Sequence, residues 1–267
     1  MKISLIVATL GRKKELFEML SSIRTSYFDL ESIEVIIIDQ NDKNFIMSEI
    51  LEFDGLNVKY IHSELRGLSL NRNIGIRQSC GEIICFPDDD CLFYKDTLSN
   101  VVSCFENHNV DFCMGRIYDR ENKLDIIKKW PQNRHKVRRF NSYFLNSSIT
   151  LFVKRKGIIE FDEDLGVGAK YGSCEDADYI YRLLKDGNIG IYSPSIEIWH
   201  PSPDFNDIPL EKVENYASGF RHYVSKDTDI VKISLFFMLM SKKFVQFLFL
   251  KHRFKKGYFS AFFRGVF

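Results

Sequence analysis

The sequence predicts an α/β protein in which a mostly parallel sheet is flanked by helices and followed by a C-terminal amphipathic helical segment. Over about the first hundred residues, apolar β-branched runs alternate with segments of helical periodicity, the pattern of parallel sheets covered by helices. Polar residues follow the ends of several of these runs. From residue 231 onward the composition becomes basic and rich in phenylalanine.

The first half alternates predicted strands and predicted helices. The strands are expected to be buried on both faces because they are continuous apolar runs; they are 2–9, 33–39, 57–63 and 82–86. The helices between them are 12–26, 44–53 and 69–79. In the first helix the apolar residues Leu16, Leu20 and Ile23 recur at helical spacing.

The second half is less regular. Strands are predicted over 110–119 and 147–155, and the polar stretch between them is poorly patterned and is expected to be a loop. A glycine-punctuated loop then leads into a helix predicted over 176–187. A last strand ends at His200.

Length and composition fit one large domain with an appendage. The chain has 267 residues, of which 45% are hydrophobic and 27% charged, so it can bury a substantial core. We predict a domain over 1–230, made of the halves 1–118 and 119–230, and a tail over 231–267. The formal net charge of +1 gives no indication of a nucleic-acid partner.

The tail is the most unusual part of the composition. It holds ten of the 24 phenylalanines, and from Ile230 onward there are eight Lys and Arg residues but no Asp or Glu. Such a mixture suits helices that lie in a membrane interface, with basic side chains on anionic head groups. Basic residues at 242–243 and 251–256 interrupt the apolar runs, so we expect the tail not to cross a bilayer. The alternative is a helical pair packed on the domain.

Cysteine usage and the N-terminus bear on the compartment. The six cysteines form no CxxC pair and no Cys/His metal spacing, which is typical of reduced thiols in a reducing cytosol. The first apolar run breaks at Gly11 and Arg12 without a small-residue cleavage site, so we expect no signal peptide. Together with the tail, these features predict a cytoplasmic protein held peripherally on the inner face of the cell membrane.

Three adjacent carboxylates, Asp88, Asp89 and Asp90, follow the predicted strand 82–86. Carboxylates this close disfavour one another's ionisation unless a cation is present. Mg²⁺ and Mn²⁺ take one or two carboxylates together with substrate phosphate oxygens. The triplet therefore points to a divalent metal bound with a diphosphate; the alternative is an acidic turn with solvated carboxylates.

Other candidate residues lie at strand ends and at one helix start. Thr9, Arg12 and Asp39 follow the first two predicted strands, and open parallel sheets bind ligands beyond the carboxyl ends of their strands. Glu175 and Asp176 lie at the start of a predicted helix, where a carboxylate stays ionised and can act as a general base. Ordinary helix N-capping is the alternative for this acidic pair.

Four blocks of this sequence resemble the family 2 glycosyltransferases in order and spacing: LIVATLGR, VIIIDQND, RGLSLNRNIGIRQSCGEIICFPDDD and GSCEDADYIYRLLKDG…IWH. The resemblance covers residues 2–202 and implies the Rossmann-like GT-A fold. It implies a metal-dependent, inverting transfer of a sugar from a nucleotide diphosphate, most often UDP, to a hydroxyl of a glycan acceptor. The halves 1–118 and 119–230 would then bind the nucleotide sugar and the acceptor. Together with the tail it implies a lipid-linked acceptor in bacterial capsule, O-antigen or other surface-polysaccharide assembly.

The resemblance also implies roles for single residues. The positions that match nucleotide-sugar contacts are Thr9, Arg12, Asp39, Arg72, Asp88 and Asp89. The positions on the metal side are Asp90 and His200, and the implied metal is Mn²⁺ or Mg²⁺. Asp176 matches the catalytic base, with Glu175 beside it on the acceptor side.

The blocks also depart from the family pattern in places that bear on the donor's base and sugar. VATLGR stands where a VPTYNR-like block is usual, DQND replaces DDGS, and Pro87 precedes the triplet in place of Leu. Two alternatives to a transferase remain open. A sugar-nucleotide nucleotidyltransferase would need a glycine-rich basic loop after the first strand, and a partner subunit would bind the nucleotide sugar without catalysis.

Overall fold

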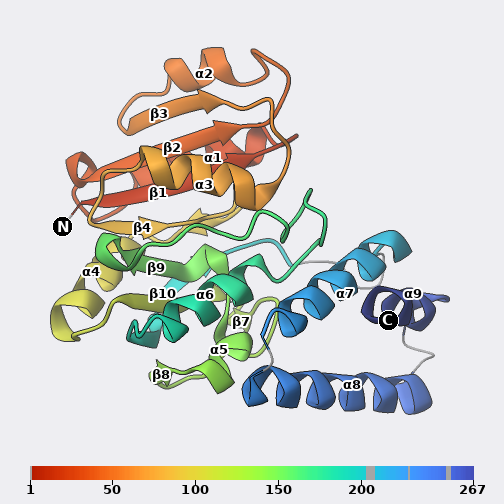
Figure 1. Cartoon of the computed structure of the whole chain (residues 1–267). Helices are drawn as coiled ribbons and strands as arrows, with labels where there is room; N and C mark the ends of the chain where they lie inside the picture. The colour runs from red at the N-terminus through yellow and green to blue at the C-terminus, as the bar shows by residue number, and fades with distance from the viewer. Residues whose placement is uncertain (1, 203–207, 228, 251–253) are drawn as a thin grey trace.

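The computed structural model describes residues 2–202, 208–227, 229–250 and 254–267. Within these ranges, a ten-stranded sheet has the order β3-β2-β1-β4-β9-β6-β10-β5, with β7 paired to β6 and β8 paired to β10. Figure 1 shows α3 and α6 in front of this sheet, with α7, α8 and α9 gathered to one side of it. The predicted α/β class is confirmed.

The first half matches the predicted alternation. The strands are β1 (Ile3–Thr9), β2 (Ile33–Asp39), β3 (Asn57–His62) and β4 (Ile83–Cys85), and all their mutual pairings are parallel. The helices are α1 (Lys14–Arg24), α2 (Met47–Leu51) and α3 (Leu68–Gln78). Nearly every residue of β1 and β2 is buried, as expected for central parallel strands covered on both faces.

The chain after β4 adds antiparallel strands to the parallel core. Its elements are β5 (Leu92–Phe93), α4 (Thr97–Asn107), β6 (Phe112–Asp119), β9 (Leu151–Lys154), α6 (Glu175–Lys185) and β10 (Gly190–Trp199). β9 runs antiparallel to both β4 and β6, whereas β6 and β10 are parallel. The stretch expected to be a loop contains β7 (Leu124–Asp125), β8 (His135–Val137) and α5 (Arg139–Leu145).

Strand register brings the predicted polar residues to one edge of the sheet. Thr9 pairs with Asp39 at the ends of β1 and β2, and the Gln40 amide continues the ladder by donating to the Thr9 carbonyl oxygen (3.0 Å). β4 pairs with the other side of β1, so the aspartates that follow it emerge beside Thr9. This edge is where ligands of open α/β sheets bind.

Three helices close the chain: α7 (Leu210–Ser225), α8 (Ile230–Leu250) and α9 (Tyr258–Val266). α9 lies directly against α7, because a Cβ placed at Gly265 would be 2.1 Å from the Glu214 carbonyl oxygen. Arg264 on α9 also forms an ion pair with Glu214 (2.8 Å). Part of the predicted tail is therefore packed on the preceding domain.

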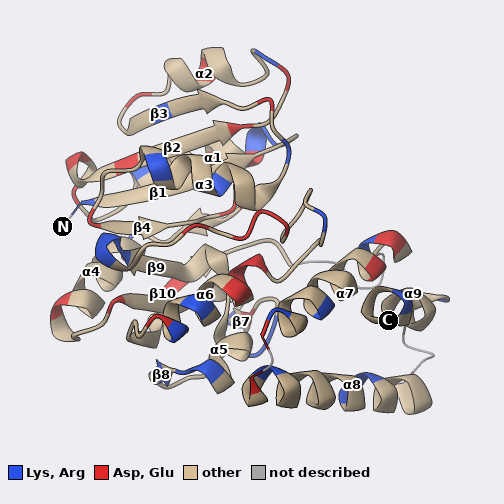
Figure 2. Ribbon diagram, in the orientation of Figure 1, with Lys and Arg blue, Asp and Glu red and all other residues tan. Residues whose placement is uncertain are grey.

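α8 is apolar and mostly uncovered. Only Lys232 and Leu235 are buried along its 21 residues, and most of the helix is tan in Figure 2. Among the described residues it is the one helix that is long and apolar enough to cross a membrane, by length and composition alone. By this criterion the lysines at 242–243 do not rule out a span, and the expectation that the tail does not cross a bilayer stays a prediction.

Candidate functional site

The acidic triplet contacts the loop that follows β1. Thr9 Oγ1 donates a hydrogen bond to Asp89 Oδ2 (2.7 Å). The Arg12 guanidinium spans two carboxylates, with Nη1 2.7 Å from Asp89 Oδ1 and Nη2 3.1 Å from Asp90 Oδ2. Burial raises the pKa of Asp89, although Thr9 and Arg12 act in the opposite direction. The structure thus brings these predicted residues together.

Asp88, Asp90 and His200 form a cluster that fits a divalent cation. One ligand atom from each residue lies within 4.8 Å of the others, and His200 Nε2 is 3.3 Å from Asp90 Oδ1. His200 Nδ1 is 2.7 Å from the Pro201 carbonyl oxygen, so Nδ1–H donates there and Nε2 is left for a metal. Asp90 Oδ1 is buried and makes no hydrogen bond within the described residues, as expected for an atom that awaits a cation.

The charges around Asp90 favour its ionised form. Burial alone would raise the pKa of this carboxyl, but His200 and Arg12 outweigh it and lower the pKa. The same contact raises the pKa of His200. Burial alone would lower that pKa, but the carboxylates of Asp90 and Asp88 outweigh the effect of burial. The negative charge that favours a proton on His200 also favours a metal cation. The cluster can therefore offer carboxylate oxygens and, once His200 Nε2 has lost its proton, an imidazole nitrogen to Mn²⁺ or Mg²⁺.

Arg72, on α3, is a buried cation with unused donors. Its side chain is 1% exposed, and Nη2 donates to Asp88 Oδ1 (2.9 Å) and to Ser148 Oγ (3.1 Å). Nε and Nη1 have no hydrogen-bond partner in the described part of the chain. Unpaired donors on a buried guanidinium beside a metal cluster suit an anionic ligand such as a phosphate.

Asp39 is held by Asn41, which follows the same predicted strand, and by Tyr60, which the sequence did not indicate. Its Oδ1 accepts hydrogen bonds from the backbone N (2.9 Å) and Nδ2 (2.6 Å) of Asn41, and its Oδ2 accepts one from Tyr60 Oη (2.9 Å). Burial, with the charge of Asp39 added, raises the pKa of Tyr60 to about 12. Gln40, a departure from the family block, accepts a hydrogen bond from the Gly67 amide (3.0 Å). It thereby ties the end of β2 to the start of α3.

Glu175 and Asp176 begin α6 and face different partners. Glu175 Oε1 is 3.8 Å from Arg72 Nη1, so Glu175 is connected through this arginine to the metal cluster. Burial and the charge of Asp176 raise the pKa of Glu175 to about 7. Asp176 Oδ1 accepts hydrogen bonds from Asn146 Nδ2 (3.0 Å) and the Ala177 amide (2.7 Å). Its Oδ2 makes no hydrogen bond within the described residues.

The turn before α6 is fixed by α7. Cys174 has φ of +69°, a left-handed conformation that is strained for a residue with a Cβ. Ser173 Oγ donates to the Tyr216 carbonyl oxygen (2.8 Å). A Cβ at Gly219 would be 2.6 Å from the Ser173 carbonyl oxygen, so only glycine allows this approach. The helix that packs on the C-terminal segment therefore also positions the acidic pair.

Sequence reasoning missed the polar residues that come from the 120–148 region. Asn146 contacts Asp176 and Ser148 contacts Arg72, and Lys128 Nζ donates to the Asn146 carbonyl oxygen (2.7 Å). The signal that could have found two of them is the polar stretch 146–148, which overlaps the start of the strand predicted over 147–155. Nothing in the sequence pattern indicated Lys128.

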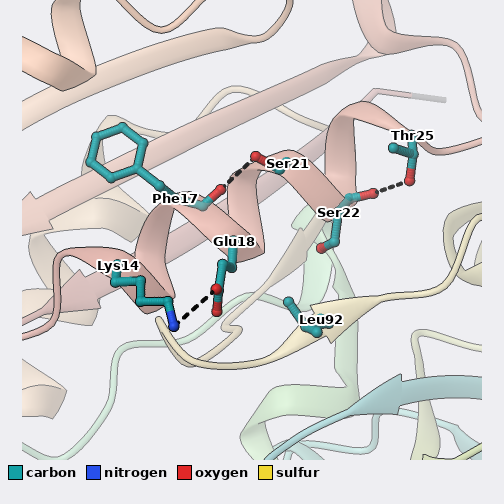
Figure 3. A pocket seen from close by; sticks show the side chains of 7 residues that line it. All are labelled: Lys14, Phe17, Glu18, Ser21, Ser22, Thr25 and Leu92. Carbon is teal, nitrogen blue, oxygen red and sulfur yellow. Dashed lines mark hydrogen bonds and ion pairs between the residues drawn. The ribbon is translucent and has the colours of Figure 1, made fainter.

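One cavity is lined by none of these residues. It has about 720 Å³ and is lined by Lys14, Phe17, Glu18, Ser21, Ser22, Thr25 and Leu92. Figure 3 shows its polar groups already paired: Lys14 with Glu18, and the Ser21 and Thr25 hydroxyls with backbone carbonyls. A smaller cavity of about 370 Å³ lies between α7 and the glycine-punctuated loop, lined in part by Gly168, Gly172 and Asn215. The candidate site is therefore defined by its charged side chains and not by the larger cavity.

Comparisons with known proteins agree on one family. The model of the family described as glycosyl transferase family 2 matches residues 4–159. The minor teichoic acid biosynthesis protein GgaB of Bacillus subtilis is 27% identical over 197 residues, which cover 65% of this chain and 22% of that protein. The poly(ribitol-phosphate) beta-N-acetylglucosaminyltransferase TarS of Staphylococcus aureus strain MW2 is 26% identical, covering 70% and 33%. The chain thus spans a third or less of the length of these curated relatives.

Solved structures support the fold. S. aureus TarS 1-349 in complex with UDP-GlcNAc has a TM-score of 0.69 at 18% identity, covering 99% of this chain and 79% of that one. The mannosyltransferase PcManGT of Pyrobaculum calidifontis, in complex with GDP-Man and Mn²⁺, has a TM-score of 0.63 at 18% identity. That comparison covers 84% of this chain and 63% of the mannosyltransferase.

Proposed function

Because the chain belongs to glycosyl transferase family 2, we propose that it transfers a sugar, with inversion, from a nucleotide diphosphate donor to a hydroxyl of a glycan acceptor. One observation carries this proposal. The cluster of Asp88, Asp90 and His200 could hold a metal. Arg72 contacts both this cluster and Glu175, and Glu175 precedes Asp176, whose Oδ2 makes no hydrogen bond among the described residues. A transferase needs these two functions side by side: leaving-group stabilisation and a base for the acceptor hydroxyl.

On the donor side, Asp88, Asp90 and His200 would hold Mn²⁺ or Mg²⁺. The metal would supply Lewis-acid neutralisation of the charge that develops on the departing diphosphate. Arg72 contacts Asp88 and has two donors, Nε and Nη1, without a hydrogen bond among the described residues, and we assign these donors to phosphate oxygens. Asp39 and Asp89 would contact the base and the ribose, with Thr9 and Arg12 holding Asp89 in place.

On the acceptor side, Asp176 would be the base and Glu175 its neighbour. The two hydrogen bonds to Asp176 Oδ1 fix the carboxylate and leave Oδ2 to take the acceptor proton. Proton removal makes the acceptor oxygen a nucleophile toward the anomeric carbon, and attack from the side opposite the diphosphate inverts that centre. The 162–174 loop and its cavity would admit the acceptor.

We further propose UDP-GlcNAc as the first donor to test and a polyol-phosphate polymer of the teichoic acid kind as the first acceptor class. The support is the naming of the relatives GgaB and TarS and the UDP-GlcNAc complex of TarS. A lipid-linked acceptor, as in capsule or O-antigen assembly, is the other acceptor class. The exposed apolar face of α8 would place the protein peripherally on the cytoplasmic face of the membrane.

The test combines donor binding with transfer. Thermal shifts with a panel of nucleotide sugars should show stabilisation by one donor only when Mn²⁺ is present. Asp176→Asn should then abolish transfer while keeping this stabilisation, and Asp186→Asn, at the exposed end of α6, should behave as wild type. Unimpaired transfer by Asp176→Asn would refute the assigned base. Release of pyrophosphate from UTP and a sugar phosphate would instead establish a nucleotidyltransferase.

A further inference from the structure

We propose that Lys128 and Asn146 form a positioning pair for Asp176, in which the Lys128 ammonium orients the Asn146 side chain and maintains a positive charge behind the base. This inference rests on the proposed function, because it takes Asp176 as the base. It adds two residues that neither the family blocks nor the relatives' names indicate.

The pair is a continuous chain of hydrogen bonds across three segments. Lys128 Nζ donates to the Asn146 carbonyl oxygen (2.7 Å) and to Asn146 Oδ1 (3.2 Å). Asn146 Nδ2 in turn donates to Asp176 Oδ1 (3.0 Å). With Oδ1 bound to the cation, the Asn146 amide can only present its NH₂ group to the carboxylate. The ammonium therefore decides which way the amide points.

The backbone at Asn146 and at Lys128 fixes both ends of this series of hydrogen bonds. Asn146 is the C-terminal cap of α5, which packs beside α6. Ile127, directly before Lys128, has φ of +69°, a conformation that a β-branched residue adopts only under constraint. The Lys128 amide closes this turn by donating to the Ile126 carbonyl oxygen (2.8 Å).

The Lys128 ammonium packs against the indole ring of Trp130. Lys128 Nζ is 4.5 Å from the centre of the Trp130 ring, within the range of a cation–π contact. The Trp130 side chain is itself buried, and its Nε1 donates to the Ile126 carbonyl oxygen (3.0 Å). The same carbonyl therefore anchors both the turn and the aromatic ring.

A lysine with a purely structural role would be expected to have a carboxylate partner. Within the described residues Lys128 forms no ion pair, and its hydrogen bonds go to neutral oxygens of Asn146. Holding a partly buried ammonium without a contacting anion costs free energy. Such a cost is tolerated mainly at functional sites. Burial lowers the pKa of Lys128 to about 8, with Asp176 the charge that opposes this.

Of the titratable groups around the pair, Asp176 is the one whose charge acts on Lys128. α6 contributes Glu175 and Asp176, α5 contributes the phenol of Tyr143, and the turn before α6 contributes the thiol of Cys174. Burial raises the pKa of both Tyr143 and Cys174, so these two are neutral. Lys128 is therefore the positive charge on the Asp176 side of the acidic pair, as Arg72 is on the Glu175 side.

Kinetics of UDP-GlcNAc transfer to poly(ribitol phosphate) with Mn²⁺ give the first test. Lys128→Met and Asn146→Ala should each lower kcat by about tenfold to a hundredfold while the KM for the donor stays the same. Lys128→Arg should restore most of the kcat. The matched control is Lys129→Met, an exposed neighbour, which should leave both constants unchanged. A Lys128→Met variant with wild-type kcat would overturn the proposal.

The pH profile separates a charged role from mere packing. Wild-type kcat should fall as the pH rises through about 8, where Lys128 loses its proton. Lys128→Arg should keep its activity to higher pH because a guanidinium does not deprotonate in this range. An identical alkaline limb in wild type and Lys128→Arg would assign Lys128 a structural role.

A measurement that needs no turnover keeps the inference separate from the proposed function. The ¹³Cε resonance of Lys128, assigned by its loss in Lys128→Arg, should titrate near pH 8 and move to lower pH in Asp176→Asn, since Asp176 raises this pKa. No movement in Asp176→Asn would overturn the pairing even if the protein transfers sugar. Movement without any transfer from nucleotide sugars would contradict the proposed function and keep the pair.

Discussion

Arg72 Nη1 lies 3.8 Å from Glu175 Oε1, while Nη2 of the same guanidinium lies 2.9 Å from Asp88 Oδ1. A single buried cation on α3 thus faces both the first turn of α6 and the acidic triplet after β4. Because Nε and Nη1 make no hydrogen bond within the described residues, this one guanidinium can interact with a bound anion as well as with both groups of carboxylates. The donor and acceptor sides of the proposed site are therefore electrostatically coupled.

Arg72→Lys should weaken binding of UDP by about tenfold to a hundredfold, because a hydrogen bond to a charged group contributes about 1.5–3 kcal/mol. A lysine keeps the charge but cannot reach Asp88, Ser148 and a phosphate at once. Calorimetric titration of UDP with Mn²⁺ measures the change. Arg77→Lys, an exposed residue of the same helix paired with Glu160, is the control. Equal UDP affinity in wild type and Arg72→Lys would show that Arg72 does not contact the diphosphate.

Glu175 should make the protein less stable as the pH rises from about 4.5 to about 7. Its pKa in the folded state is raised to about 7 by burial and by Asp176, above the value of about 4.3 in an unfolded chain. The native state therefore binds more protons than the unfolded state in this window, so stability falls as the pH rises and stays lower above it. Full ionisation of Glu175 lowers the free energy of unfolding by about 4 kcal/mol.

Urea unfolding of wild type and Glu175→Gln at a series of pH values checks this. The glutamine variant should lose the pH-dependent decrease between about 4.5 and 7 and be more stable than wild type at pH 8. Glu160→Gln, at an exposed site, should keep the wild-type profile. If Glu175→Gln shows the same slope as wild type, another group is responsible for it.

Local patterns were enough to predict the first half and most of the site. β1 and β2 are mostly apolar and almost wholly buried, so strand type, burial and the edge where Thr9 and Asp39 emerge could be predicted from the local pattern of each strand. The acidic triplet and the Glu175–Asp176 pair were recognisable because several like charges follow a buried strand or begin a helix. In such places local sequence and tertiary position are linked.

The residues that were missed depend on contacts between distant segments. Lys128 reaches Asn146 through a strained turn at Ile127, a residue whose type disfavours that conformation. The short strands β7 and β8 form because β6 and β10 offer edges to pair with, and two or three residues carry no periodicity. For α8, the lysines at 242–243 favoured a helix that does not span a membrane, whereas the length and composition of the whole helix also fit a span.

Metal binding should depend on Asp90 and His200. With UDP at about 100 times its Kd, binding adds about 2.7 kcal/mol to stability, which for a chain of this size raises Tm by about 5–10 °C. This shift should require Mn²⁺, disappear with EDTA, and be lost in Asp90→Asn and reduced in His200→Gln. His135→Gln, in exposed β8, should keep the full shift. A full UDP shift in the presence of EDTA would mean that the donor binds without a metal.

The exposed face of α8 should bind anionic lipid surfaces. Phe237 and Phe244 are 64% and 55% exposed, and burying each side chain in a membrane interface contributes about 1.5–3 kcal/mol. Replacing both with Asp should therefore lower partitioning onto phosphatidylglycerol vesicles by more than tenfold in a sedimentation assay. Point substitutions are preferable to removal of 231–267, because Leu235 and the α9 residues Phe259 and Ala261 are buried.

Leu51→Asp is the matched control for this experiment. Leu51 is 69% exposed on α2, at the opposite end of the sheet from α8 in Figure 1, so the variant adds a charge without touching the proposed membrane face. It should partition as wild type.

Because Lys and Arg contribute to binding through anionic head groups, wild-type partitioning should also fall as salt is raised or as phosphatidylcholine replaces phosphatidylglycerol. Equal partitioning of wild type and the Phe237/Phe244 double variant would show that α8 does not make the membrane contact, and a second protein chain would then be the candidate to cover it.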